Sequence, residues 1–86
     1  MVLSPNPAIS NFTVKYTAAA AGSVTIRITD VSGKTLQTLT RGAARGVNTF
    51  NLQKKSSWKP GTYFVTVQQG SKVVKGKLLV QGTREE

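Results

Sequence analysis

The sequence predicts an all-β protein, a sandwich of seven antiparallel strands, and two observations carry this prediction. Hydrophobic and polar residues alternate with a period of two along three segments, 12–17, 24–29 and 63–68. Such alternation directs one set of side chains into a core and the other towards water. Turn-forming residues also recur about every ten residues, a spacing that favours an antiparallel sandwich over a parallel sheet.

The strands are expected between these turns, and no segment has the pattern of a stable helix. In chain order they are a short piece around 8–9, then 12–17, 24–29, 35–41, 47–52, 62–69 and 72–80. The best helix candidate, TAAAAG at 17–22, is short and precedes a strand at once, so a loop or strand end is expected there. In the segment 35–41, Leu36 and Leu39 are three residues apart. A β-bulge would bring both to the core side.

Four turns separate the later strands. In the first, Gly33 supplies a positive φ and the Asp30 carboxylate accepts an amide N–H from Ser32 or Gly33. It is followed by a longer loop at 42–46, a proline–glycine turn at 59–61 and a tight hairpin at 69–71.

Length and composition limit the function. The 86 residues support one small domain, with a core over about 4–80 and a tail at 81–86. There is no histidine or cysteine, and the only acids are Asp30, Glu85 and Glu86. A catalytic triad, a pair of carboxylates or a first-row metal site cannot be assembled from this set, so we expect no enzyme and no cofactor.

The formal charge of +9 favours attraction to anions, and equally describes a charged surface without a dedicated partner. Two lysine clusters stand out, 54–59 and 72–77. Binding to single-stranded nucleic acid would need several aromatic rings on one sheet face, and only Phe64 is available. No specific nucleic-acid partner is therefore predicted. The chain also lacks an apolar run of membrane-spanning length or a secretory signal peptide, and we expect it to be a fragment of a larger exported protein.

Trp58, in the loop before Pro60, has two interpretations. It is expected to close one end of the sandwich, because a buried aromatic ring stabilises a small core strongly. The alternative is an exposed stacking platform in a non-catalytic adhesion or carbohydrate-binding module.

The last strand carries three lysines, Lys72, Lys75 and Lys77. On an exposed sheet edge they would discourage pairing with other chains. They are equally suited to recognition by a chosen partner, and the two roles are compatible.

Five segments, in order, resemble one family, the type A C-terminal sorting domain of the type IX (Por) secretion system. The segments are 4–8 with PNP, 24–34 with D-x-x-G-K, 46–52 with G-x-N, 60–65 with a shortened P-x-G-x-Y-x-V, and the basic 75–80. The motif residues within them are Pro5, Asn6, Pro7, Asp30, Gly33, Lys34, Pro60, Gly61 and Tyr63. A flagellar hook-scaffold domain has a similar arrangement, so an architectural relative is a second possibility.

The resemblance implies an immunoglobulin-like sandwich and a function in export. Such a domain marks an attached cargo for passage through the periplasm and across the outer membrane, to the cell surface or beyond. The implied partners are an outer-membrane shuttle, the translocon and a sortase that removes the domain, and the cargo is often joined to anionic lipopolysaccharide. The residues expected to be read by this machinery are Lys72, Lys75, Lys77, Leu78, Leu79 and Val80. The motif residues are expected to have structural roles, with Tyr63 a core residue that has a polar tip.

Overall fold

The computed structural model describes residues 1–4, 11–53, 55 and 58–80, and within them the chain forms seven β-strands and no helix. The strands are β1 (Val2–Ser4), β2 (Asn11–Ala18), β3 (Gly22–Asp30), β4 (Thr35–Ala43), β5 (Gly46–Gln53), β6 (Gly61–Gln69) and β7 (Lys72–Val80). The all-β prediction is confirmed. Across these ranges no helix is long and apolar enough to cross a membrane.

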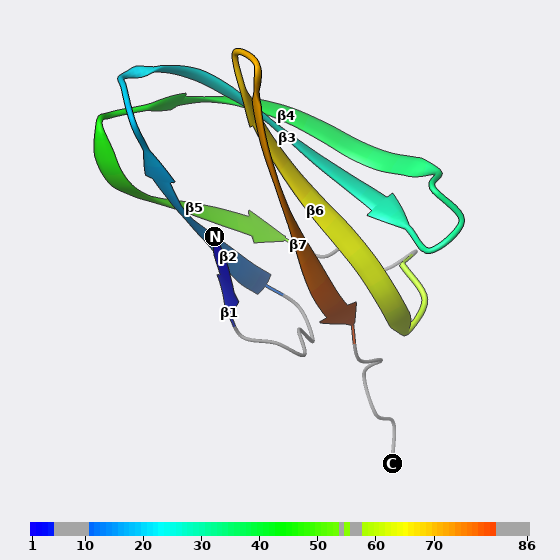
Figure 1. Ribbon diagram of the computed structural model, residues 1–86. Helices are drawn as coiled ribbons and strands as arrows, with labels where there is room; N and C mark the ends of the chain where they lie inside the picture. Colours follow the sequence, from blue (N-terminus) through cyan, green and yellow to red (C-terminus); the bar gives the residue numbers. More distant parts are fainter. Residues whose placement is uncertain (5–10, 54, 56–57, 81–86) are drawn as a thin grey trace.

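The strands form two antiparallel sheets that pack face to face (Figure 1). One sheet has the order β1-β2-β5 and the other the order β4-β3-β6-β7. This arrangement is a β-sandwich, consistent with the immunoglobulin-like type. The strand expected around 8–9 falls outside the described residues, and the first strand of the structure is β1, which pairs with β2.

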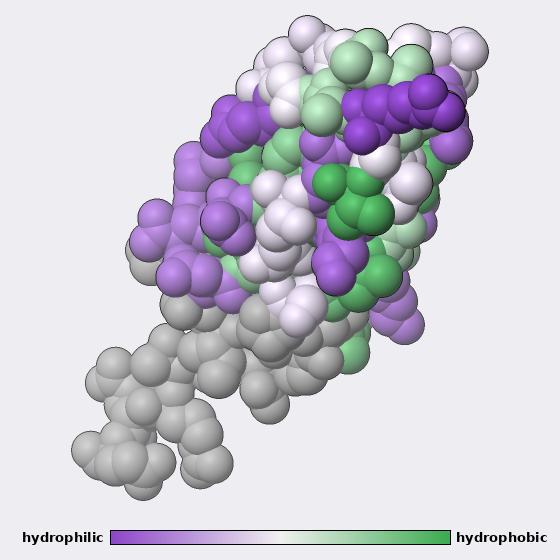
Figure 2. Space-filling view, turned by 90° about the vertical axis from the view of Figure 1, so that its left-hand side faces the viewer, coloured by the Kyte–Doolittle hydropathy of each residue, from purple (hydrophilic) through white to green (hydrophobic). Residues whose placement is uncertain are grey.

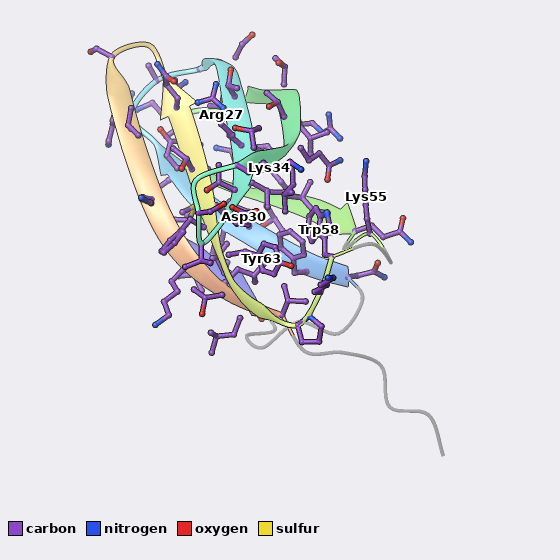
Figure 3. All side chains as sticks on the ribbon, turned by 90° about the vertical axis from the view of Figure 1, so that its right-hand side faces the viewer. Arg27, Asp30, Lys34, Lys55, Trp58 and Tyr63 are labelled. Carbon is purple, nitrogen blue, oxygen red and sulfur yellow. The ribbon has the colours of Figure 1, made fainter. Side chains whose placement is uncertain are left out.

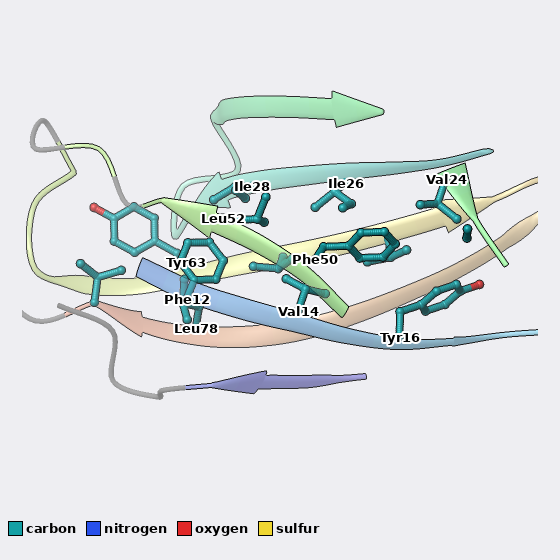
Figure 4. Close-up of a cluster of buried hydrophobic side chains, with 14 of the residues drawn as sticks. Phe12, Val14, Tyr16, Val24, Ile26, Ile28, Phe50, Leu52, Tyr63 and Leu78 are labelled. Atoms are coloured by element: carbon teal, nitrogen blue, oxygen red, sulfur yellow. The ribbon is translucent and has the colours of Figure 1, made fainter. Parts of the chain in front are cut away.

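The core lies between the sheets and is filled by alternate residues of each strand (Figure 4). Strand β2 supplies Phe12, Val14 and Tyr16, and its intervening residues point to the outside. The central strands β3 and β6 follow the same rule. Among the residues that are fully buried are Val14, Ile26, Ile28, Val65, Val67 and Leu78. The period of two in the sequence therefore corresponds directly to the inner and outer faces of the sheets.

The irregular spacing of leucines in β4 is resolved by a bulge. Thr29 of β3 pairs with Thr35 and Ile28 pairs with Gln37, so Leu36 is the extra residue on β4. Both Leu36 and Leu39 pack against the core. The predicted bulge is confirmed, and it interrupts the regular ladder at the β4 edge.

The two sandwich ends are closed by side-chain hydrogen bonds and turns. At one end the Tyr16 hydroxyl donates to Gln69 Oε1 at 3.0 Å, and Gln69 Nε2 donates to the Ala20 carbonyl at 2.9 Å. The predicted hairpin before β7 has Gly70 at φ 61°. These bonds join the β2–β3 connection to the β6–β7 hairpin.

The two sheets approach closely where β1 crosses β7. A Cβ added at Gly76 would lie 2.8 Å from Met1 Cε and 3.2 Å from Leu3 Cδ1. Glycine in the middle of a strand marks such a close approach, because an added side chain would have to displace those of Met1 and Leu3.

The Gly76→Val variant should therefore be less stable by about 1–3 kcal/mol, the usual cost of overpacking a core. Urea denaturation measures this change. The control is Gly42→Val in β4, where an added Cβ meets nothing within 4 Å. Valine favours strands, so the control should be neutral or slightly stabilising. Equal losses in both variants would contradict the close approach of β1 and β7.

Candidate functional site

Strand β7 lies at the edge of its sheet. Its nine residues pair with β6 from Gly61↔Val80 to Gln69↔Lys72, and no other strand of the described chain pairs with it. Figure 3 shows β7 at the margin, with β6 beside it. Among the described residues, the lysine-bearing strand is therefore an edge strand, as predicted.

The residues predicted for recognition are divided between the two faces of β7. Lys75, Lys77 and Leu79 point to the outer face, whereas Leu78 and Val80 are 0% and 4% exposed and belong to the core. Lys72 is exposed beside the hairpin. In the folded domain, the side chains of the outward set are therefore at the surface, whereas those of Leu78 and Val80 are covered.

The outward lysines lie around a single aromatic ring. Phe64 is half-buried on the outer face of β6, directly opposite Lys77, and the Lys75 Nζ lies 4.7 Å from the centre of its ring. This is a cation–π contact. It holds the Lys75 side chain over the sheet while its ammonium stays at the surface.

Strand pairing adds a cation that the sequence pattern did not single out. Arg27 of β3 is paired with Thr66 of β6, which in turn is paired with Lys75. The three outward cations of this sheet face are therefore Arg27, Lys75 and Lys77, and the described part of the face carries no acid. The period of two could have placed Arg27 outward, but only the strand order brings it near Lys75.

Exposed hydrophobic residues do not form a single patch. They are Val2 of β1, Val31 of the turn after β3, Val47 of β5, and Val73 and Leu79 of β7. On the face drawn in Figure 2, hydrophobic residues form small patches between hydrophilic ones. Two of the five, Val73 and Leu79, flank the outward lysines of β7.

Of the family motif residues that the structure describes, Asp30, Lys34 and Tyr63 lie together, away from the β6–β7 hairpin (Figure 3). Asp30 of β3 pairs with Tyr63 of β6, and Tyr63 pairs with Leu78 of β7. Gly61 pairs with Val80, the last residue of β7. The motifs thus hold the final residues of the basic strand.

Asp30 organises the turn between β3 and β4. Its Oδ1 accepts hydrogen bonds from the Ser32 amide at 3.0 Å, the Ser32 hydroxyl at 2.6 Å and the Lys34 amide at 2.9 Å. Gly33 has φ 94°, a conformation that favours glycine. The predicted role of both residues is confirmed. Of these donors, the Ser32 hydroxyl contributes most to lowering the pKa of Asp30 below its ordinary value, followed by the Lys34 amide.

Trp58 closes this end of the core. It is 5% exposed, stacks on Tyr63 with ring centres 5.7 Å apart, and contacts Phe12 at 6.4 Å. The Tyr63 hydroxyl donates to the Lys59 carbonyl, so Tyr63 is a core residue with a polar tip, as predicted. The closing role of Trp58 is confirmed. A stacking platform needs an exposed ring, which Trp58 does not provide.

A shallow hollow beside Trp58 carries further lysines. It is lined by Lys34, Lys55 and Lys59, with Asp30 as its acid. Since Asp30 is engaged by the turn, the hollow is a cationic surface rather than an acid–base site. In the described ranges no group of three or more histidine, cysteine, aspartate or glutamate side chains comes together.

Sequence reasoning missed the role of Asn48 in the G-x-N motif. Its Oδ1 accepts from the Ala44 amide at 2.9 Å, and its Nδ2 donates to the carbonyls of Ala44 and Gly46. Gly46 has φ 104°. The Asn48 side chain thus pairs with backbone N–H and C=O groups in the turn between β4 and β5. In the sequence, the short G-x-N spacing could have indicated this turn.

Pro5-Asn6-Pro7 of the family pattern and the tail predicted at 81–86 lie outside the described residues. The structural role expected of the PNP motif stays a prediction.

The fold and the site define a small β-sandwich module whose larger sheet has a basic edge strand among the described residues. The family model described as "Secretion system C-terminal sorting domain" matches residues 3–81, and the chain belongs to this family. No curated protein and no solved structure matches it significantly. The domain is therefore a type IX secretion sorting signal, which directs export towards the outer membrane or cell surface and engages the secretion machinery. This family of signals is not catalytic.

The Asp30→Asn variant tests the turn through its pH dependence. The pKa of Asp30 is lowered by folding, so its charge stabilises the native state at pH above the ordinary value of 3.8. This contribution is lost as the pH falls through the lower, folded-state pKa. The variant should be less stable than the wild type at neutral pH, and the difference should shrink in acid. Urea midpoints across this range measure it, and a constant difference would contradict the ionic role of Asp30.

Truncation of Trp58 tests the closed end of the core. Trp58→Ala should cost about 3–5 kcal/mol, as for other large aromatic residues removed from a core. The matched variant Phe64→Ala, on the outer face, should cost less because the ring is only half-buried. Thermal or urea unfolding measures both, and an equal cost would contradict the closing role of Trp58.

Proposed function

We propose that this domain is read, in its folded form, by an outer-membrane shuttle and the translocon, and that a sortase then removes it from its cargo. In this proposal the domain is the C-terminal part of a longer exported protein that passes through the periplasm. The cargo is released or is joined to anionic lipopolysaccharide at the cell surface. The domain itself contributes recognition and no chemistry.

The observation that carries this proposal is the position of the basic strand at the edge of its sheet, among the described residues, in a member of the sorting-domain family. Lys72, Lys75, Lys77 and Leu79 present exposed side chains that the machinery would read, whereas the side chains of Leu78 and Val80 pack in the core and would act by holding the strand in place.

An adhesion or carbohydrate-binding module was the alternative interpretation. It depended on Trp58 as an exposed platform, and burial of this ring removes its main support. No other aromatic residue on the described outer faces joins Phe64 to form a stacking surface.

The export function is tested by fusing residues 1–86 behind a signal peptide and a reporter in a strain with a type IX system. The reporter is expected at the cell surface or in the medium. Its size should show that the domain has been removed. Retention of the reporter in the periplasm would reject the sorting proposal. Surface reporter that still carries the domain would reject removal by a sortase.

The role of the lysines is tested in the same assay with two triple variants. Replacing Lys72, Lys75 and Lys77 by glutamine should leave most of the reporter in the periplasm. The control replaces Lys15, Arg41 and Arg45, which are exposed elsewhere, and has the same net charge. Equal export by the two variants would contradict a specific role of the β7 lysines.

A further inference from the structure

We propose that strand β5 pairs with β5 of a second copy of this chain, so that two domains share one continuous sheet. The inference goes beyond the export function, which concerns the β7 side of the sandwich. It follows from three features: the regular edge that β5 forms, the neutral side chains of this strand and the position of the cations around it.

Strand β5 is an edge strand of the smaller sheet in the part of the chain that the structure describes. Its eight residues all pair with β2, from Asn11↔Gln53 to Ala18↔Gly46, and no other described strand pairs with it. The register runs without a shift along the whole strand. The far side of β5 is therefore a regular row of backbone N–H and C=O groups, which is a template for a further strand.

The other edge strands each carry a feature that discourages pairing, and β5 does not. Strand β1 is only three residues long, β4 has a bulge and Arg41, and β7 has three lysines. Strand β5 reads GVNTFNLQ, with no charged residue, no proline and no bulge. A long, regular edge without such protection favours pairing with another chain.

The side chains of β5 are complementary to a second copy of the same strand. Two identical antiparallel strands are related by a two-fold axis, which passes through one residue so that facing side chains share a face of the sheet. With the axis at Thr49, residues 46–52 of both copies pair, and Thr49 faces Thr49 of the second copy. Val47, which is 66% exposed, faces Asn51. Facing threonines stabilise a sheet, and no like charges lie opposite each other in this register.

An axis at Phe50 would overlap the strands equally but would lose the pair of threonines, since Thr49 would then face Asn51. The axis at Thr49 also brings Arg45, which precedes β5, beside Gln53 of the second copy rather than beside a cation. We therefore place the axis at Thr49.

The cations of the domain lie away from this interface. Strands β1 and β5 are opposite edges of the smaller sheet, and β1 packs on β7 at Gly76, so the β7 lysines are on the other side of the sandwich. On the outer face of the smaller sheet, Lys15 of β2 pairs with Thr49. In the dimer, the two Lys15 residues would be three strand spacings apart, about 14 Å. This exceeds the Debye length of about 8 Å at physiological salt, so their repulsion is largely screened.

Sedimentation of residues 1–86 over a range of concentrations tests the pairing. Dimerisation should tighten as salt rises from about 0.05 M to about 0.5 M, because screening weakens the repulsion between two domains of charge +9. Backbone amide shifts that accompany dimerisation should lie along β5 and not along β7. A monomer under all these conditions, a dimer that salt weakens, or shifts along β7 alone would overturn the inference.

A lysine on the two-fold axis gives the decisive variant. Thr49→Lys places two like charges directly opposite each other in the dimer and should weaken dimerisation about tenfold. The matched control is Thr38→Lys in β4. Both threonines are exposed on an edge strand, and each faces a cation on the neighbouring strand, Lys15 for Thr49 and Arg27 for Thr38. The control should dimerise like the wild type. Circular dichroism verifies that both variants are folded, and equal weakening in both would overturn the inference.

Cross-linking tests the same register without an added charge. The chain has no cysteine, so Thr49→Cys supplies its only thiol. Directly facing residues of antiparallel strands have Cα atoms about 4.5–5.5 Å apart, within the range of a disulfide. Mild oxidation should link Thr49→Cys into a dimer much faster than Asn51→Cys or Thr38→Cys, whose thiols do not face each other across the axis. Equal rates in the three variants would indicate random collision and would overturn the inference.

Discussion

The pairing of β3 with β6 at the centre of the larger sheet is the interaction on which the other features depend. Their inward residues Ile26, Ile28, Val65 and Val67 are fully buried against the opposite sheet. Since side chains alternate, burying this set fixes the neighbouring residues on the outer face. A shift of one residue would bury Arg27 without a counter-ion, at a large cost in free energy. The core therefore determines both the register and the charged surface.

The sandwich leaves sheet edges open, and the edges are protected in different ways. Strand β1 is only three residues long, and β4 carries a bulge. Both devices discourage any incoming strand, whatever its sequence. The lysines of β7 act differently, because their effect depends on the charge that faces them. They oppose basic strands in particular, because like charges directly opposite each other destabilise a sheet.

The sequence predicted the strands and their faces well, but not their neighbours. Periodicity placed Phe64 and Lys75 outward, and the spacing of Leu36 and Leu39 predicted the bulge. It could not show that Arg27 lies in one row with Lys75, because strand order depends on pairing between distant segments. The contact of Met1 and Leu3 with Gly76 was missed for the same reason. Strand β1 was not predicted, since three residues are too few to show a period.

The described family motif residues stabilise the end of the basic strand. Asp30 and Tyr63 lie in the same row as Leu78, and Gly61 pairs with Val80. These residues hold the end of β7 in an extended conformation against β6. Lys75 and Lys77 share one face only while β7 is extended, because an unfolded segment has no fixed face. This arrangement of the two lysines thus exists only in the folded domain. If the secretion machinery reads both lysines on one face, as proposed, it would distinguish a folded sorting domain from an unfolded one without contacting the core.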